Sequence, residues 1–154
     1  MSTPKPPEAA VLIGIQATGK SSFVRQRMFD THVRINLDML RTRHREAQLL
    51  DACLRTGQSF VIDNTNPSRD DRARYISPAR AAGFAITGYY FQSAIAAALH
   101  RNEQREGAAR IADAGILSTH ARLELPQLHE GFDALFYVAL SPGGFEVQEW
   151  RDEV

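Results

Sequence analysis

The sequence predicts a three-layer α/β fold in which a mainly parallel, five-stranded sheet carries helices on both faces. Short apolar runs alternate with helical stretches along the 154 residues, a pattern typical of a parallel sheet covered on both sides. The first of these runs, Val11–Ile13, leads into a glycine turn and then a helical stretch. The length fits one domain, so we expect a single domain over residues 10–154 after a disordered, proline-rich leader at 1–9.

The turn after this first strand reads GIQATGKS and matches the phosphate-loop spacing GxxxxGKS. Gly14 and Gly19 permit the turn and a close approach of the backbone to an anion, and Lys20 supplies charge for the terminal phosphates. The Ser21 hydroxyl can ligate Mg²⁺. The alternative is a chance glycine turn. We expect ATP and Mg²⁺ as cofactors, with the nucleotide held by Gly14, Ile15, Gln16, Ala17, Thr18, Gly19, Lys20, Ser21 and Ser22.

The following elements alternate in type. The second to fourth strands are expected at residues 31–35, 59–63 and 84–91. The helices are expected at 39–55, from Pro67 or Ser68 to about 82, and at 94–105. Gly57 and Gly83 end the first two of these helices, Pro78 is expected to kink the second, and Ser93 is expected to cap the third.

The last third of the chain is less regular in composition. Residues 106–117 are small and mobile in character, residues 118–125 are helical, and 134–140 form the fifth strand. The tail is expected to add a short hairpin or strand around 145–147.

Polar residues follow the second and third strands, at the sheet edge where such folds bind ligands. Asp38 is placed to take or orient the proton of an incoming hydroxyl, although it could instead cap the next helix. Asp63 could hold a Mg²⁺-bound water or cap the turn that follows it. This arrangement favours a small kinase, since no Asn-Lys-x-Asp guanine signature occurs and the chain is short for a ring-forming ATPase with a helical second domain.

Two arginines mark a candidate lid. Arg101 and Arg105 are four residues apart, so on a helix they share a face, repel each other and favour an anionic ligand. An arginine on a mobile flap can stabilise charge on a transferring phosphoryl group. The alternative is a solvated helix in which Glu103 and Glu106 offset the two arginines.

Composition limits the classes of function. The net charge is zero, which argues against a broad basic surface for nucleic acid but leaves room for a local groove. Of the 18 basic residues only Lys5 and Lys20 are lysines, and guanidinium groups suit phosphate contacts, although GC-rich coding bias would give the same count. Cys53 is the only cysteine, which predicts a buried structural thiol and a reducing compartment.

Membrane and zinc partners are not expected. No apolar run approaches spanning length and the first residues lack a signal core, so we expect a cytoplasmic protein. The five histidines show no zinc-ligand spacing. The oligomeric state is left open.

From about Val11 to Leu140 the chain resembles the polynucleotide 5′-hydroxyl kinase family, particularly the kinase domain of the animal DNA-repair kinase-phosphatases. The similar stretches are GIQATGKSSF, VRINLDML, VIDNTNPSRDDRARYISPARAAG, RNEQR and EGFDALFYV. The resemblance implies ATP-dependent phosphorylation of a 5′-OH end of DNA or RNA, with Lys20 on the phosphates, Asp38 as general base and Arg105 as the lid arginine. It also implies that Arg41 binds a phosphate of the acceptor strand and that Asn66 matches an asparagine of a family turn that binds the acceptor. We assign Arg101 to acceptor binding as well.

The chain departs from this family in places. Leu37 stands where the family usually has arginine, and IQAT replaces a proline and a second glycine in the loop. No Asp-x-Asp-x-Thr phosphatase motif occurs. Two alternatives therefore stay open: a kinase of a small hydroxyl acceptor such as a sugar or nucleoside, and a nucleotide-binding regulator with no acceptor.

Two further clusters have two interpretations each. Arg69, Arg72 and Arg74 could line an acceptor groove, although neighbouring carboxylates favour a solvated helix face. The run Tyr89–Phe91 could stack on bases, but its place in a strand favours core packing.

Overall fold

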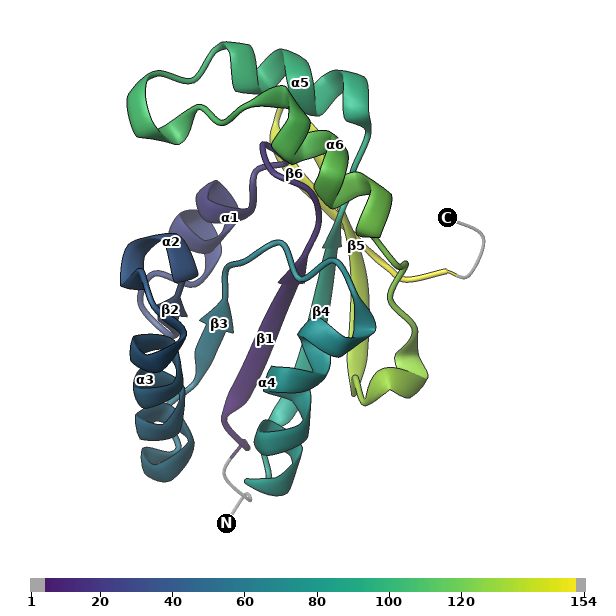
Figure 1. Cartoon of the computed structure of the whole chain (residues 1–154). Coiled ribbons are helices and arrows are strands. Elements are labelled where there is room, and N and C mark those ends of the chain that lie inside the picture. The colour runs from purple at the N-terminus through teal and green to yellow at the C-terminus, as the bar shows by residue number, and fades with distance from the viewer. Residues whose placement is uncertain (1–4, 152–154) are drawn as a thin grey trace.

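The computed structural model describes residues 5–151 and shows a single sheet with helices on both faces (Figure 1). Its strands are β1 Glu8–Ile13, β2 Val33–Ile35, β3 Phe60–Ile62, β4 Ala85–Phe91, β5 Ala134–Ser141 and β6 Gly144–Glu149. Their order across the sheet is β2-β3-β1-β4-β5-β6, and every neighbouring pair is parallel except β5 and β6. The predicted fold class is confirmed. The sixth strand comes from the tail, which forms an antiparallel hairpin with β5.

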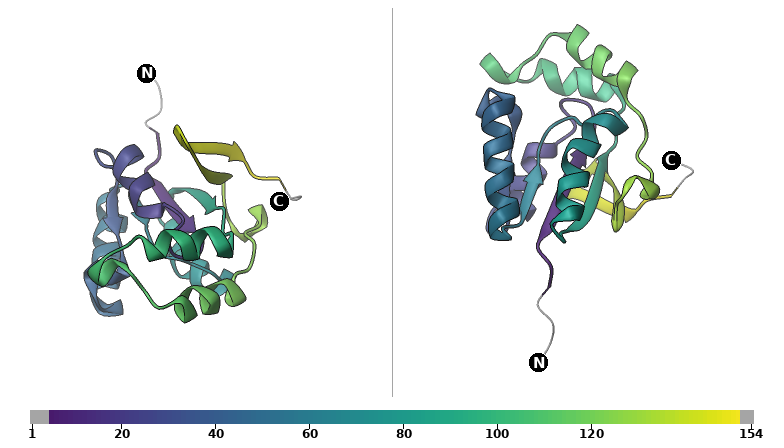
Figure 2. Two further views of the ribbon diagram at one scale, coloured as in Figure 1. Left: turned by 90° about the horizontal axis from the view of Figure 1, so that it is seen from above. Right: turned by 60° about the horizontal axis from the view of Figure 1, so that its bottom comes forward.

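Six α-helices accompany the sheet in the part of the chain described. They are α1 Lys20–Arg27, α2 Leu37–Leu40, α3 Arg43–Thr56, α4 Arg69–Ala81, α5 Ile95–Glu103 and α6 Asp113–Arg122. Figures 1 and 2 show α5 and α6 together across the end of the sheet where β1 points, above the turns that follow the strands. The two helices also contact each other.

The core has one part on each face of the sheet. Successive residues of β1 point to opposite faces, so Val11 packs with α3 and α4, while Leu12 packs with Phe23 and Val24 of α1. The turn that follows β1 is itself largely buried, because Ile15 and Ala17 pack against Ala98 of α5 and Ile116 of α6.

The aromatic run of β4 belongs to this core. Phe91 lies 5.3 Å from Phe23 between ring centroids, in an edge-on arrangement, and Tyr89 lies 5.3 Å from Phe23. Core packing is thus the correct interpretation. The predicted structural thiol is confirmed too, because Cys53 is buried between α3 and the sheet, and burial raises its pKa.

The predicted helix over residues 39–55 is two helices. Arg41 has a positive φ of +78°, which ends α2, and Thr42 then caps α3 by accepting a hydrogen bond from the Arg45 amide at 3.1 Å. Asn36 caps α2, where its side chain accepts from the Met39 amide at 2.9 Å. Asp38 is therefore not a helix cap and lies inside α2.

Three other boundaries differ from the prediction. Strand β1 starts at Glu8, inside the predicted leader, whose residues 1–4 lie outside the described part. Helix α6 starts at Asp113 and ends at Arg122, earlier at both ends than expected. Ser93 does not cap α5: Ala94 holds that position, and the Ser93 hydroxyl is buried in other contacts. No helix within residues 5–151 is long and apolar enough to span a membrane.

Candidate active site

The loop after β1 is fixed to the neighbouring strands at its first two residues. The Gly14 amide donates to the Thr65 carbonyl at 2.9 Å, and the Ile15 amide donates to the Ser93 hydroxyl at 3.1 Å. A side chain at Gly14 would place its Cβ 3.1 Å from the Phe91 Cβ, and φ there is +152°. Glycine is required at this close approach. The first two amides thus anchor the loop and leave the later ones for a ligand.

The second half of the loop leads into α1 and forms an anion site. Gly19 is the N-cap, with φ +96°. The amides of Lys20, Ser21 and Ser22 lie in the first turn, where they have no partner within the helix. Helix N-termini of this kind bind phosphate through backbone amides and the helix dipole. This is the geometry expected for the phosphate loop.

Lys20 is buried beneath this loop, with 8% of its surface exposed. Its ammonium group donates to the carbonyls of Gly14 at 2.9 Å and Ile15 at 2.6 Å. The pKa of Lys20 is lowered to about 8, mainly by burial; the Asp63 carboxylate opposes this shift, and Arg105 adds to it. The charge of Lys20 is therefore sensitive to mildly alkaline pH.

Ser21 and Asp63 form a candidate metal site. The Ser21 hydroxyl donates to Asp63 Oδ2 at 2.9 Å, and Asp63 is only 2% exposed. Hydroxyl and carboxylate oxygens suit Mg²⁺, which usually keeps several waters and takes phosphate oxygens as further ligands. The donor set therefore fits Mg²⁺. Within residues 5–151 no group of three His, Cys, Asp or Glu side chains could hold a metal by itself.

Sequence reasoning missed Arg34 on β2. Its Nε donates to Asp63 Oδ2 at 2.8 Å and its Nη2 donates to the Ser21 hydroxyl at 3.3 Å. The only signal in the sequence is the position of Arg34, two residues before Asn36 at the end of a strand. The guanidinium fixes the Asp63 carboxylate in one orientation beside the phosphate loop.

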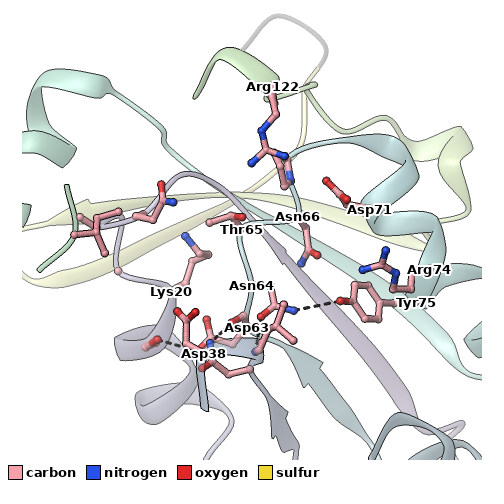
Figure 3. A pocket seen from close by; sticks show the side chains of 18 of the residues that line it. Lys20, Asp38, Asp63, Asn64, Thr65, Asn66, Asp71, Arg74, Tyr75 and Arg122 are labelled. Atoms are coloured by element: carbon pink, nitrogen blue, oxygen red, sulfur yellow. Dashed lines mark hydrogen bonds between the residues drawn. The ribbon is translucent and has the colours of Figure 1, made fainter. Parts of the chain in front are cut away.

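A pocket of about 390 Å³ lies between this loop, α2, α4 and the α5–α6 segment (Figure 3). Nine of the predicted site residues line it, among them Lys20, Ser21, Asp38, Asp63, Asn66 and Arg105. Asp38 is exposed in its wall on α2. Gln16, Ala17 and Gly19 of the loop also face it. One concave site thus brings together the phosphate loop, a free carboxylate and an arginine of the candidate lid.

Three predicted acceptor residues lie elsewhere or are already engaged. Arg41 is exposed and outside the lining of the pocket. Arg101 also lies outside it, and its Nε donates to the Ala17 carbonyl of the loop. Burial lowers the pKa of Arg101, and Arg105 lowers it further. Asn66 lines the pocket but is 4% exposed, and its amide donates to the Leu12 carbonyl at 2.7 Å.

The segment after α5 is held by one side chain. Asn102 is fully buried and bonds to both the amide and the carbonyl of Ile111, at 3.1 and 2.7 Å. This closes the loop that carries Arg105, whose Nη1 donates to the Ala109 carbonyl at 3.3 Å. Arg105 therefore enters the pocket from a short closed loop above Lys20.

The three arginines around α4 have three different environments. Arg72 is fully buried, with two bonds to the Glu130 carboxylate at 2.8 and 3.1 Å and one to the Asn66 carbonyl at 3.0 Å. Arg69 lies on the surface, 3.7 Å from Glu124. Only Arg74 lines the pocket. Neither an acceptor groove nor a solvated helix face therefore describes all three residues.

Arg43 of α3 and Arg122 of α6 also line the pocket and were not predicted. Figure 3 shows Arg74 beside Tyr75, across the pocket from Lys20, and Arg122 at the top of the view, above Asn66. Arg74 and Arg122 are exposed, and neither is within 4.0 Å of a carboxylate among residues 5–151. Their guanidinium groups are free to meet an anion.

The fold and the site define a phosphate-loop kinase domain. A family model described as an AAA domain matches residues 10–126, and the chain belongs to this family. Among curated proteins, the bifunctional polynucleotide phosphatase/kinase of Schizosaccharomyces pombe is 29% identical over 129 residues, which cover 81% of this chain and 32% of that protein. The putative bifunctional polynucleotide phosphatase/kinase of Acanthamoeba polyphaga mimivirus is 28% identical and covers 86% of this chain and 33% of that protein. The chain thus spans about a third of these relatives.

Solved structures share the fold at lower identity. Kti12 of Chaetomium thermophilum, solved with ADP-AlF3, has a TM-score of 0.67 at 16% identity, covering 88% of this chain and 92% of that one. A gluconokinase from Sinorhizobium meliloti has a TM-score of 0.61 at 17% identity, covering 90% and 85%. The family match and the two curated relatives support the resemblance of the sequence to polynucleotide kinase-like phosphate-loop proteins.

Proposed function

We propose that this chain transfers the γ-phosphate of ATP to the 5′-hydroxyl end of a DNA or RNA strand. The observation that carries the proposal is the charge of the pocket wall beyond Asp38. Arg43, Arg74 and Arg122 come from three different helices and face the same space. A strand end offers phosphates next to its terminal hydroxyl, and guanidinium groups bind phosphate well.

The arginines of this wall could also compensate for the leucine at position 37. The polynucleotide kinase family usually has an arginine at this position, and this chain has Leu37. Arg74 and Arg122 would supply positive charge to the acceptor from the opposite side of the pocket. The names of the two curated relatives agree with a polynucleotide acceptor.

Each group has a role in the proposed reaction. Lys20 and the amides of the phosphate loop would hold the phosphates of ATP, and Mg²⁺, held by Ser21 and through water by Asp63, would neutralise their charge. Asp38 would accept the proton of the attacking hydroxyl. Arg105 would stabilise the negative charge that develops on the transferring group.

The test is transfer of labelled γ-phosphate from ATP to 5′-OH oligonucleotides, single-stranded and duplex. We expect label on the oligonucleotide, and a loss of about 10²- to 10⁴-fold in Asp38→Asn, with ATP affinity retained. Asp51→Asn is the matched control, because Asp51 is an exposed carboxylate on α3 outside the pocket. Unlabelled oligonucleotide with intact ATP binding would contradict the proposed acceptor, and full labelling by Asp38→Asn would contradict the proposed base.

A small-molecule acceptor is the second candidate, because Leu37 adds an apolar surface to the pocket wall and the gluconokinase shares the fold. Ionic strength separates the two. Contacts with phosphates release counterions, so the KM of an oligonucleotide should rise with salt. The KM of a neutral sugar or nucleoside should not.

A further inference from the structure

A buried cluster of polar side chains lies behind the helix that carries Asp38. Glu46 of α3 is only 2% exposed, and its carboxylate accepts from three groups. Arg43 Nη1 donates at 2.8 Å, the Tyr75 hydroxyl at 3.0 Å and Asn64 Nδ2 at 3.2 Å. Burying a carboxylate is costly unless its oxygens are paired in this way. The proposed chemistry gives Glu46 no role.

Asn64 connects this cluster to α2. Its Oδ1 accepts from the Leu37 amide at 2.9 Å, while its Nδ2 donates to Glu46 and to the Tyr75 hydroxyl, the latter drawn in Figure 3. Leu37 is the first residue of α2 and Asp38 the second. A helix of four residues does not hold its own geometry in water. Its position therefore depends on side chains that bond to its first amides.

The side-chain amide of Asn64 has a donor, its NH₂ group, and an acceptor, its carbonyl oxygen. The group that one of them bonds to therefore decides which of them faces Leu37, and this couples Glu46 to Leu37. A carboxylate only accepts, so it turns the NH₂ group of Asn64 toward itself and leaves the carbonyl oxygen for the Leu37 amide. A glutamine at position 46 has one oxygen and one NH₂ group for the same three donors. If that NH₂ faces Asn64, two donors oppose each other. A flipped Asn64 would then present its NH₂ to the Leu37 amide instead.

We infer that Glu46 is a positioning residue for the acceptor half of the reaction: through Asn64 it fixes the start of α2 and hence the Asp38 carboxylate. The inference rests on the proposed function, in which Asp38 is the base. It predicts a loss of transfer rate without a loss of ATP binding, because the phosphate loop has its own anchors at Thr65 and Ser93.

The test compares Glu46→Gln with Asp51→Asn, which makes the same change at an exposed site of the same helix. We expect Glu46→Gln to lower kcat for transfer about tenfold to 100-fold, as a misplaced catalytic group does, with the Kd of ATP unchanged. The Leu37 amide should exchange with solvent about two- to tenfold faster by NMR, as expected for one lost hydrogen bond. Asp51→Asn should change neither.

Tyr75→Phe separates positioning from a general loss of packing. It removes one donor to Glu46 and one of the two acceptors of the Asn64 NH₂ group. The Glu46 carboxylate still orients Asn64, so kcat should stay within about twofold. If Glu46→Gln does not fold, Asn64→Ala serves in its place, because Glu46 keeps its bonds to Arg43 and Tyr75.

Two results would overturn the inference: unchanged exchange of the Leu37 amide in Glu46→Gln, or equal losses of kcat in Glu46→Gln and Tyr75→Phe. If the wild-type protein labels no oligonucleotide, the proposed function fails instead. The exchange rate of the Leu37 amide then still decides whether Glu46 fixes α2.

Discussion

Nucleotide binding should weaken at alkaline pH because Lys20 loses its charge. Burial lowers the pKa of Lys20 to about 8, against about 10.4 for an exposed lysine. A bound phosphate favours the charged form, so the protonated protein binds and the neutral one binds poorly. Affinity should therefore follow the protonated fraction of Lys20.

The size of the effect follows from this pKa. With a pKa of about 8, the protonated fraction falls from about 0.76 at pH 7.5 to about 0.09 at pH 9. The Kd of ATP should then rise about eightfold over this range. In the same range binding should take up protons, because the phosphates draw Lys20 back to its charged form.

Calorimetric titration with ATP in EDTA measures both quantities without a metal ion. Repeating it in buffers with different ionisation enthalpies gives the number of protons taken up. Lys20→Arg is the control, since a guanidinium stays charged at pH 9. A Kd with the same pH dependence in the wild-type protein and in Lys20→Arg would refute the reasoning.

Three further predictions concern the surroundings of the pocket. Ser93→Ala leaves the buried Ile15 amide without its acceptor, which should cost about 1–3 kcal/mol in urea unfolding and weaken ATP binding; unchanged values would mean that the loop does not depend on Ser93. Arg72→Met should cost about 3–5 kcal/mol because it leaves the Glu130 carboxylate unpaired, and adding Glu130→Met should recover most of that loss. Arg122→Gln should raise the KM for an oligonucleotide and reduce the salt dependence by about one phosphate contact, with the KM of a nucleoside as the control that stays constant.

The sequence was most informative where local pattern and function coincide. The phosphate-loop spacing and the alternation of apolar runs identified β1, the turn and α1, because glycine and lysine have few alternatives at those positions. Helix continuity was less predictable. The stretch 39–55 has helical composition throughout, but Arg41 adopts a positive φ, which its residue type does not predict.

Charged side chains were the hardest to place. Arg72 and Arg74 are two residues apart, yet one is fully buried against Glu130 and the other lines the pocket. Glu46 lies among exposed residues of α3 but faces inward. Such positions depend on partners far away in the chain, which a local pattern does not reveal. Arg34 was missed for the same reason, because its partner is Asp63, which directly follows the neighbouring strand β3.

The two halves of the site are built differently, and this bears on how one framework serves different acceptors. The proposed nucleotide half is anchored, through Gly14 and Ile15, to the turns that follow β3 and β4. The proposed acceptor half rests on α2, which has no buried residue and is held by the side chains of Asn36 and Asn64. Substitutions around α2 can therefore move the acceptor site while the phosphate loop stays intact. Such a division would allow proteins that share this fold, such as a polynucleotide phosphatase/kinase and a gluconokinase, to differ at the acceptor site.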